Sequence, residues 1–151
     1  MKLAIRVAAL LAAALVVVSG AAAAEIGRIK VVKGQVSVQR GAETLVARPG
    51  MTLEAGDEVR TAGDASVGIT MSDNSLLSAG PNSTLALDRF AFDTTTYQGK
   101  FDASLKRGTL AVVSGKIAKQ SPEAMSIRTP AAILGVRGTE FVVSAADAPA
   151  R

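Results

Sequence analysis

The chemistry open to this chain is limited to what carboxylates, hydroxyls and cationic side chains can do, because its 151 residues include no His and no Cys. Without these two residue types there is no Ser-His-Asp triad, no Cys nucleophile, no imidazole acid or base and no His/Cys zinc site. The Ser-x-x-Lys spacing of a Ser/Lys acyl enzyme does not occur either. We therefore expect no cofactor and no metal.

Aspartate and glutamate supply the remaining acid–base groups. Asp57 and Glu58 point to opposite faces if they lie in one strand, while Asp88, Asp93 and Asp102 lack a recognisable glycosidase or nuclease spacing. The sequence thus predicts no catalytic residues and a protein that is not an enzyme. The alternative is a carboxylate-based carbohydrate-active enzyme or a polysaccharide-binding protein. Such an enzyme would need a pocket with two convergent carboxylates.

The Asp73-Asn74-Ser75 cluster lacks the spaced oxygen ligands of a calcium loop. An aspartate side chain can instead accept a hydrogen bond from the backbone two residues further on, which forms an Asx turn. We expect such a turn here and not a metal site.

The N-terminal segment has the features of a secretory signal. Lys2 and Arg6 precede an apolar run at Val7–Val18, and small residues at Ala22–Ala24 form a cleavage site before Glu25. The apolar run is well short of the roughly 20 residues that span a bilayer. The sequence therefore predicts export to the periplasm with cleavage of residues 1–24, and the alternative is that the segment is kept as an anchor.

The remaining chain is long enough for one domain, which we place at residues 25–144 with a flexible tail at 145–151. Of the 17 basic residues two lie in the signal, so the mature chain carries 15 basic against 13 acidic residues. Its basic residues are scattered, and the chain has only four Phe and one Tyr. Nucleic-acid binders usually show a concentrated basic stripe with aromatic residues, so no nucleic-acid partner is expected.

Beyond Glu25 the sequence consists of short alternating apolar and polar runs separated by Gly, Asp, Asn and Pro, which is the pattern of strands and turns. It predicts an all-β fold, a single antiparallel twisted sandwich or short solenoid-like β roll of about ten strands. Residues 90–100 fit either a long loop or a Thr-rich edge strand. The apolar residues expected to be buried are Val36, Val38, Val67, Ile69, Leu85, Leu87, Leu110, Val112, Ile127 and Phe141.

The most specific motif pairs Thr129-Pro130 with the element Gly135-x-Arg137-Gly138-Thr139-x-Phe141. On these residues the chain resembles the FecR domain family, over about residues 29–143. Asn74 stands where the family more often has Gly. Earlier residues that match the family pattern in order are Gly34, Val36, Gly50, Leu53, Gly56, Asp57, Val59, Thr61, Asp64, Ser66, Asp73 and Ser75.

The resemblance implies a periplasmic all-β domain that binds or senses and does not catalyse. In the best-known members this domain follows a cytoplasmic anti-sigma segment and a transmembrane helix, neither of which is recognised here, so direct sigma-factor regulation is not expected to carry over. What the resemblance implies is a sensing or scaffolding module in the cell envelope that recognises a protein or an envelope polymer.

The signature bend around residues 129–141 is predicted to be mainly structural. Arg137 and Glu140 could form a ligand-binding charge pair, but Gly135 and Gly138 are expected to bracket a tight bend in which Arg137 donates to nearby carbonyls. Residues 107–112 resemble residues 137–142, as two turns that lead into strands would. The residues assigned to this bend are Thr129, Pro130, Gly135, Arg137, Gly138, Thr139 and Phe141.

A candidate partner edge follows the bend. Phe141, Val142 and Val143 are apolar and favour strands, and family members commonly continue well past this point. We expect an edge strand open to a protein partner or to a second copy in a homo-oligomer. The alternative is that these residues pair on both sides, or that charges and Pro in the 147–151 tail blunt the edge.

Overall fold

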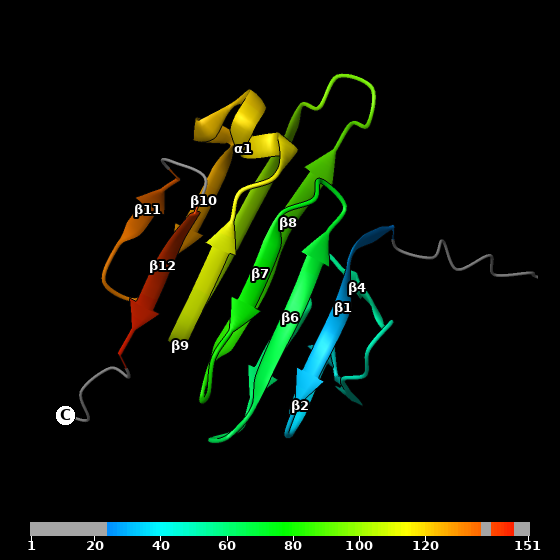
Figure 1. The fold of residues 1–151 in the computed structure, drawn as a ribbon, viewed down its shortest axis with the longest axis vertical. Helices are drawn as coiled ribbons and strands as arrows, with labels where there is room; N and C mark the ends of the chain where they lie inside the picture. The colour runs from blue at the N-terminus through cyan, green and yellow to red at the C-terminus, as the bar shows by residue number, and fades with distance from the viewer. Residues whose placement is uncertain (1–23, 137–139, 147–151) are drawn as a thin grey trace, which may run out of the picture.

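A computed structural model describes residues 24–136 and 140–146, so the predicted signal at residues 1–24 lies outside the described part except for its last residue. This part forms twelve strands, one α-helix and one short 3-10 helix (Figure 1). The elements are β1 Glu25–Lys33, β2 Val36–Arg40, β3 Glu43–Val46, β4 Thr52–Glu54, β5 Glu58–Thr61, β6 Ser66–Met71, β7 Leu76–Ala79, β8 Thr84–Phe92, β9 Gly99–Val113, α1 Lys116–Gln120, η1 Pro122–Ala124, β10 Met125–Arg128, β11 Ile133–Gly135 and β12 Glu140–Ala145.

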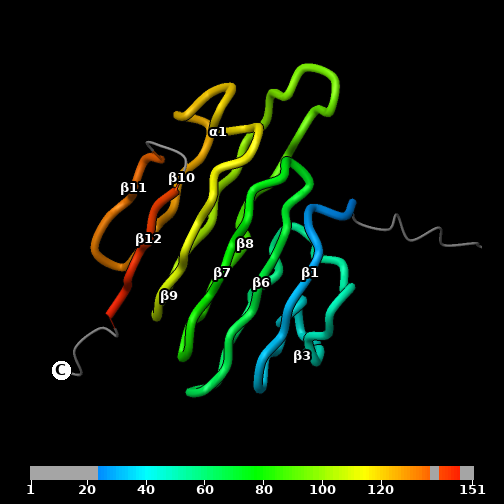
Figure 2. Tube along the Cα trace, in the orientation of Figure 1, coloured from blue at the N-terminus to red at the C-terminus, as the bar shows by residue number. Residues whose placement is uncertain are grey.

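The strands form one curled sheet with the order β3-β2-β5-β8-β9-β7-β6-β1-β4, so the prediction of an all-β twisted roll is confirmed. The long β9 belongs to both halves: its first part pairs with β8 and β10, and its second part pairs with β7 and β12. We call the half with β4, β1, β6, β7 and β12 sheet A, and the half with β3, β2, β5, β8, β10 and β11 sheet B. Sheet A lies in front of sheet B in Figures 1 and 2.

One strand pair departs from the antiparallel prediction. β10 runs parallel to β9, with Met125 opposite Phe101 and Arg128 opposite Ser104. A parallel neighbour needs a crossover connection, and α1 with η1 supplies it between β9 and β10.

The core lies between the two sheets and follows the predicted alternation. Nine of the ten residues expected inside are at most 5% exposed, and Phe141 is half-buried against the same core. Phe101 and Leu105 of β9 add large buried side chains from a segment whose strand the sequence did not reveal. Because β9 shows one face to this core along both sheets, it joins them into one domain.

The Asp73–Ser75 turn is an Asx turn, and it also holds α1. Ser75 N donates to Asp73 Oδ1 at 3.0 Å, and Asn74 has a φ of 67°. The carboxylate, which is fully buried, also accepts from Ile117 N at 3.2 Å, while Lys116 N donates to the Asp73 carbonyl at 2.8 Å. This side chain therefore supplies a partner for a helix that is too short to be stable alone.

The undecided segment at residues 90–100 contains the turn of a hairpin. β8 continues to Phe92, and Asp93 Oδ1 then accepts from Thr95 N at 2.8 Å and from Thr96 N at 3.1 Å. These two hydrogen bonds lower the pKa of Asp93. The segment is thus a strand end, a short Asx-type turn and the start of β9, and not an edge strand.

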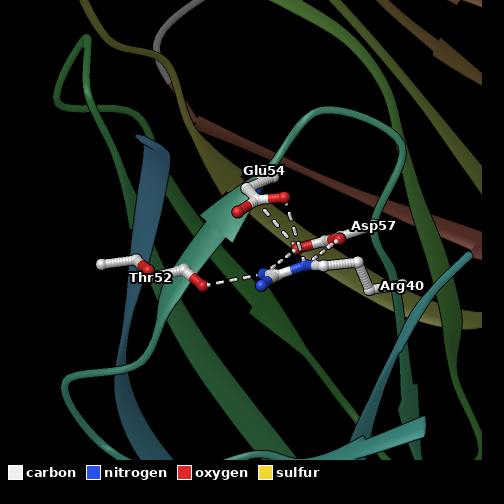
Figure 3. A network of polar contacts seen from close by, with 4 residues as sticks. All are labelled: Arg40, Thr52, Glu54 and Asp57. Carbon is white, nitrogen blue, oxygen red and sulfur yellow. Dashed lines mark hydrogen bonds and ion pairs between the residues drawn. The ribbon is translucent and has the colours of Figure 1, made fainter. Parts of the chain in front are cut away.

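Arg40 forms an ion pair with the buried side chain of Asp57 (Figure 3). Arg40 Nε donates to Asp57 Oδ1 at 3.0 Å and Arg40 Nη2 to Asp57 Oδ2 at 2.8 Å, while Arg40 Nη2 also reaches the Thr52 carbonyl at 3.2 Å. Glu54 N donates to the same carboxylate at 2.9 Å. The Asp57 hydrogen bond raises the pKa of Arg40. One buried carboxylate thus joins β2, β4 and the turn before β5.

Candidate interaction surface

The described part of the signature bend is a tight hairpin turn between β10 and β11. Thr129 N donates to the Ala132 carbonyl at 2.8 Å, and Ala132 N donates to Thr129 Oγ1 at 3.1 Å, with Pro130 exposed between them. These two hydrogen bonds close the turn, and the structural role of Thr129 and Pro130 stays a prediction.

The glycine half of the bend is only partly described. Gly135 ends β11, and a Cβ added there would meet no atom within 4 Å, so the structure shows no need for glycine at this position. The predicted bend residues Arg137, Gly138 and Thr139 lie outside the described residues. The predicted likeness between residues 107–112 and 137–142 therefore falls partly outside the described part, including Gly138.

β12 is an edge strand within the described part of the chain. Its residues Phe141, Val142 and Val143 pair with β9, opposite Val112, Ala111 and Leu110, and no other strand of the described residues pairs with β12. Val142 is 70% exposed, Phe141 is half-buried and Val143 is buried. One side of this strand therefore presents backbone groups at the margin of sheet A, next to β9 in Figure 1.

The outer face of sheet A is mainly apolar, although the charged side chains of Lys30 and Glu140 also lie on it. A depression of about 330 Å³ crosses its middle strands. Its floor is made of small residues that are neighbours across the sheet, because Gly68 lies opposite Ser78 and Ser78 opposite Ala111. The exposed apolar side chains on this face are Val31, Leu76, Val113 and Val142. The face thus continues from the depression to the free edge of β12.

The outer face of sheet B carries a cluster of charged side chains around Glu58, beside exposed apolar ones such as Val46. The Glu58 side chain is 13% exposed and accepts from Lys106 Nζ at 2.6 Å and from Arg60 Nε at 2.7 Å. Burial raises the pKa of Glu58, but the hydrogen bonds from Lys106 and Arg60 outweigh it, so the pKa lies below its ordinary value.

Glu58→Gln should have a pH-dependent effect on stability. A carboxylate whose pKa is lower in the folded state stabilises the fold above its unfolded pKa. It loses this contribution as the pH falls through the folded pKa. We expect the substitution to lower the free energy of unfolding by about 0.5 to 1 kcal/mol at neutral pH, since both cationic partners are more than half exposed. The difference should vanish well below about pH 4. Urea titrations of both proteins across this range measure it, and a difference that is constant with pH would contradict the ionic role.

The same face holds a polar depression of about 300 Å³ that includes Asp88 and Asp102. Asp88 accepts a hydrogen bond from Ser104 Oγ, and Asp102 Oδ1 accepts one from Ser126 Oγ at 2.7 Å. Two carboxylates thus share one concave surface, as the carbohydrate alternative requires. Asp88 is exposed, however, and both groups are already engaged by serines, which favours ligand binding over acid–base chemistry.

Two further findings concern metal ligation and membrane spanning in residues 24–136 and 140–146. No group of three or more Asp or Glu residues in this range could hold a metal ion. None of its helices is long and apolar enough to cross a bilayer.

Comparison with known proteins gives one match. A family model described as FecR protein matches residues 57–151, which is more than half of the chain. The matched region begins at Asp57, the carboxylate that Arg40 binds, so the family positions suggested by the sequence between Gly34 and Gly56 precede it. No curated protein and no solved structure matches the chain.

Proposed function

Since the chain belongs to the FecR family, we propose that it is a non-catalytic sensing or scaffolding module of the periplasm that recognises a protein partner. The family is regulatory, non-enzymatic and associated with the cell envelope. Export by the segment at residues 1–24 is part of the proposal. It is supported by the start of β1 at Glu25, the first residue after the predicted cleavage site, where Glu25 pairs with Glu54 of β4.

The free edge of β12 carries the proposal. An edge strand offers a row of backbone donors and acceptors that another strand can satisfy, and side chains beside the edge then select the partner. Here the apolar outer face of sheet A supplies those side chains, with Val142 at the edge and Val113 and Leu76 on the next two strands. A protein strand that pairs with β12 would extend sheet A and cover part of this face.

Lysine at Val142 tests the proposal, because an edge lysine opposes strand addition while a 70% exposed side chain contributes little to the core. The chain has no Cys, so Ser144→Cys provides a single attachment point on β12 for a photo-crosslinker. The crosslink is formed in the periplasm and the crosslinked partner is identified by mass spectrometry. Adding Val142→Lys to the Ser144→Cys protein should reduce the amount of crosslinked product about tenfold, which corresponds to about 1.4 kcal/mol of binding free energy.

Val46→Lys is the matched control. Val46 is 72% exposed on β3, an edge strand of sheet B, so the two variants carry the same change at nearly equal exposure. Both should melt within a few degrees of the wild type, and only Val142→Lys should lose the product. A folded Val142→Lys protein that crosslinks as strongly as the wild type would show that β12 is not the interface.

A further inference from the structure

The polar depression on sheet B is built around a break in the regular pairing of β8. The register of β8 against β9 shifts between Ala86 and Arg89. Asp88 and Arg89 follow directly on a run of buried residues and are both exposed, whereas a regular strand would turn one of them inward. Bulges of this kind re-aim side chains and recur beside functional sites.

Three neighbouring strands complete the depression. Across β8, β9 and β10, Arg89 lies opposite Asp102, and Asp102 lies opposite Ser126. In the adjacent row, Ser104 lies opposite Arg128. At the usual strand spacing the three strands span about 10 Å, which is wide enough for one sugar ring.

The acceptors in this depression are already oriented. Ser104 holds Asp88 and Ser126 holds Asp102 by hydroxyl hydrogen bonds. An ionised carboxylate has room for about four hydrogen bonds, so both groups can still accept from ligand hydroxyls. Lys100 Nζ lies 3.8 Å from Asp102 Oδ1 and offsets part of that charge.

The two guanidinium groups in this depression are unpaired among the described residues. Arg89 and Arg128 both line it, and within the described residues neither side chain makes a hydrogen bond or an ion pair. Each guanidinium offers five donors in a planar fork that matches a carboxylate or phosphate group. Arg89 is adjacent to Asp102 in the register and still does not pair with it, so its donors remain available to a ligand.

We propose that this depression binds an acidic sugar residue of an envelope polymer, with Arg89 and Arg128 at the anionic group and Asp88 and Asp102 at the hydroxyl groups. A sugar acid combines both needs, since its hydroxyls donate to carboxylates and its carboxylate accepts from guanidinium groups. Counting Lys100, three cations face two carboxylates, which favours a singly charged ligand. Among the described residues no aromatic ring lines the depression, so hydrogen bonds supply the affinity.

Calorimetry with tetragalacturonate, maltotetraose and inorganic phosphate as separate probes tests the proposal on the exported protein. Tetragalacturonate should bind in about the high-micromolar to millimolar range, and neither the neutral sugar nor phosphate should bind comparably. The double variant R89Q/R128Q should weaken tetragalacturonate binding by at least about tenfold, since hydrogen bonds to charged groups are the strong ones. Both side chains are exposed, so melting should be unchanged.

R28Q/R48Q is the matched control, because it removes the same charge from exposed arginines outside the depression. Its affinity should equal that of the wild type. The proposal is overturned if tetragalacturonate does not bind or if maltotetraose binds equally. It is also overturned if an equal concentration of inorganic phosphate displaces tetragalacturonate, or if the control variant loses as much affinity as R89Q/R128Q. Val142→Lys should leave this binding intact, so the outcome is independent of the β12 edge.

Discussion

Gly108→Ala is expected to lower the free energy of unfolding by about 3 kcal/mol or more. Gly108 has a φ of +93°, a region that costs an L-residue about 1 to 2 kcal/mol. An added Cβ would also lie 2.5 Å from Ser83 Cα and 2.6 Å from Ser83 Cβ, and closer still to Ser83 Oγ, so it cannot fit without moving β9. Overpacking of this kind typically costs about 1 to 3 kcal/mol in addition.

The collision would also disturb a buried hydrogen-bond network. Ser83 Oγ accepts from Thr109 N at 3.0 Å and donates to the Thr109 carbonyl at 3.2 Å, while Ser83 N donates to Thr61 Oγ1 at 2.8 Å. Displacing Ser83 would break these hydrogen bonds, which adds to the penalty, although the Thr109 carbonyl keeps its hydrogen bond from Gly80 N at 3.0 Å.

Gly41→Ala separates backbone strain from collision. Gly41 has a φ of +58°, but a Cβ added there meets nothing within 4 Å, so only the strain of about 1 to 2 kcal/mol applies. Urea denaturation of the two variants measures the difference. Equal losses would contradict the close approach of Ser83 to Gly108.

Gly108 matters because β9 changes sheets there. Arg107 pairs with Thr84 in sheet B, while Gly108 pairs with Ala145 at the end of β12 in sheet A. The conformation of one glycine therefore sets the position of the candidate edge relative to the polar depression on β8, β9 and β10. The two proposed surfaces share this strand although they use different faces.

The alternating pattern predicted the core because each strand faces only one interior. Val67 and Ile69 are buried, while Gly68 between them lies on the outer face. Alternating burial of this kind depends only on neighbouring residues in one strand, so it can be predicted from the sequence without knowledge of distant contacts.

The remaining fold depends on long-range contacts. α1 is five residues long, and its support comes from Asp73, some forty positions earlier in the chain. The parallel pairing of β10 with β9 is likewise decided by where α1 and η1 return the chain. Neither feature has a periodicity of its own that sequence analysis could detect.

The sequence predicted the candidate partner edge but not the polar depression. The apolar triplet of Phe141, Val142 and Val143 predicted β12, and its free side follows from pairing that only the structure shows. The polar depression was missed because its members come from three strands and a bulge. A signal existed in the sequence, since Asp88 and Arg89 interrupt alternation directly after Leu85–Leu87.

Removing Arg40 is the second large effect we expect. The Asp57 carboxylate is 1% exposed. Of the groups that contact it in Figure 3, Arg40→Met would leave only the backbone N–H of Glu54 as a hydrogen-bond donor. Stranding a buried charge costs about 3 to 5 kcal/mol, and because Arg40 itself is 30% exposed we expect about 2 to 4 kcal/mol. Arg28→Met, which breaks the exposed pair with Glu25, should cost less than about 1 kcal/mol.

The double variant Arg40→Met/Asp57→Asn distinguishes a stranded charge from lost packing. Asparagine keeps an oxygen for Glu54 N and carries no charge, so the double variant should be more stable than Arg40→Met alone by about 1 to 2 kcal/mol. Denaturation by urea at neutral pH measures the cycle. If the second substitution instead adds to the loss, the carboxylate stabilises the turn before β5 without its arginine.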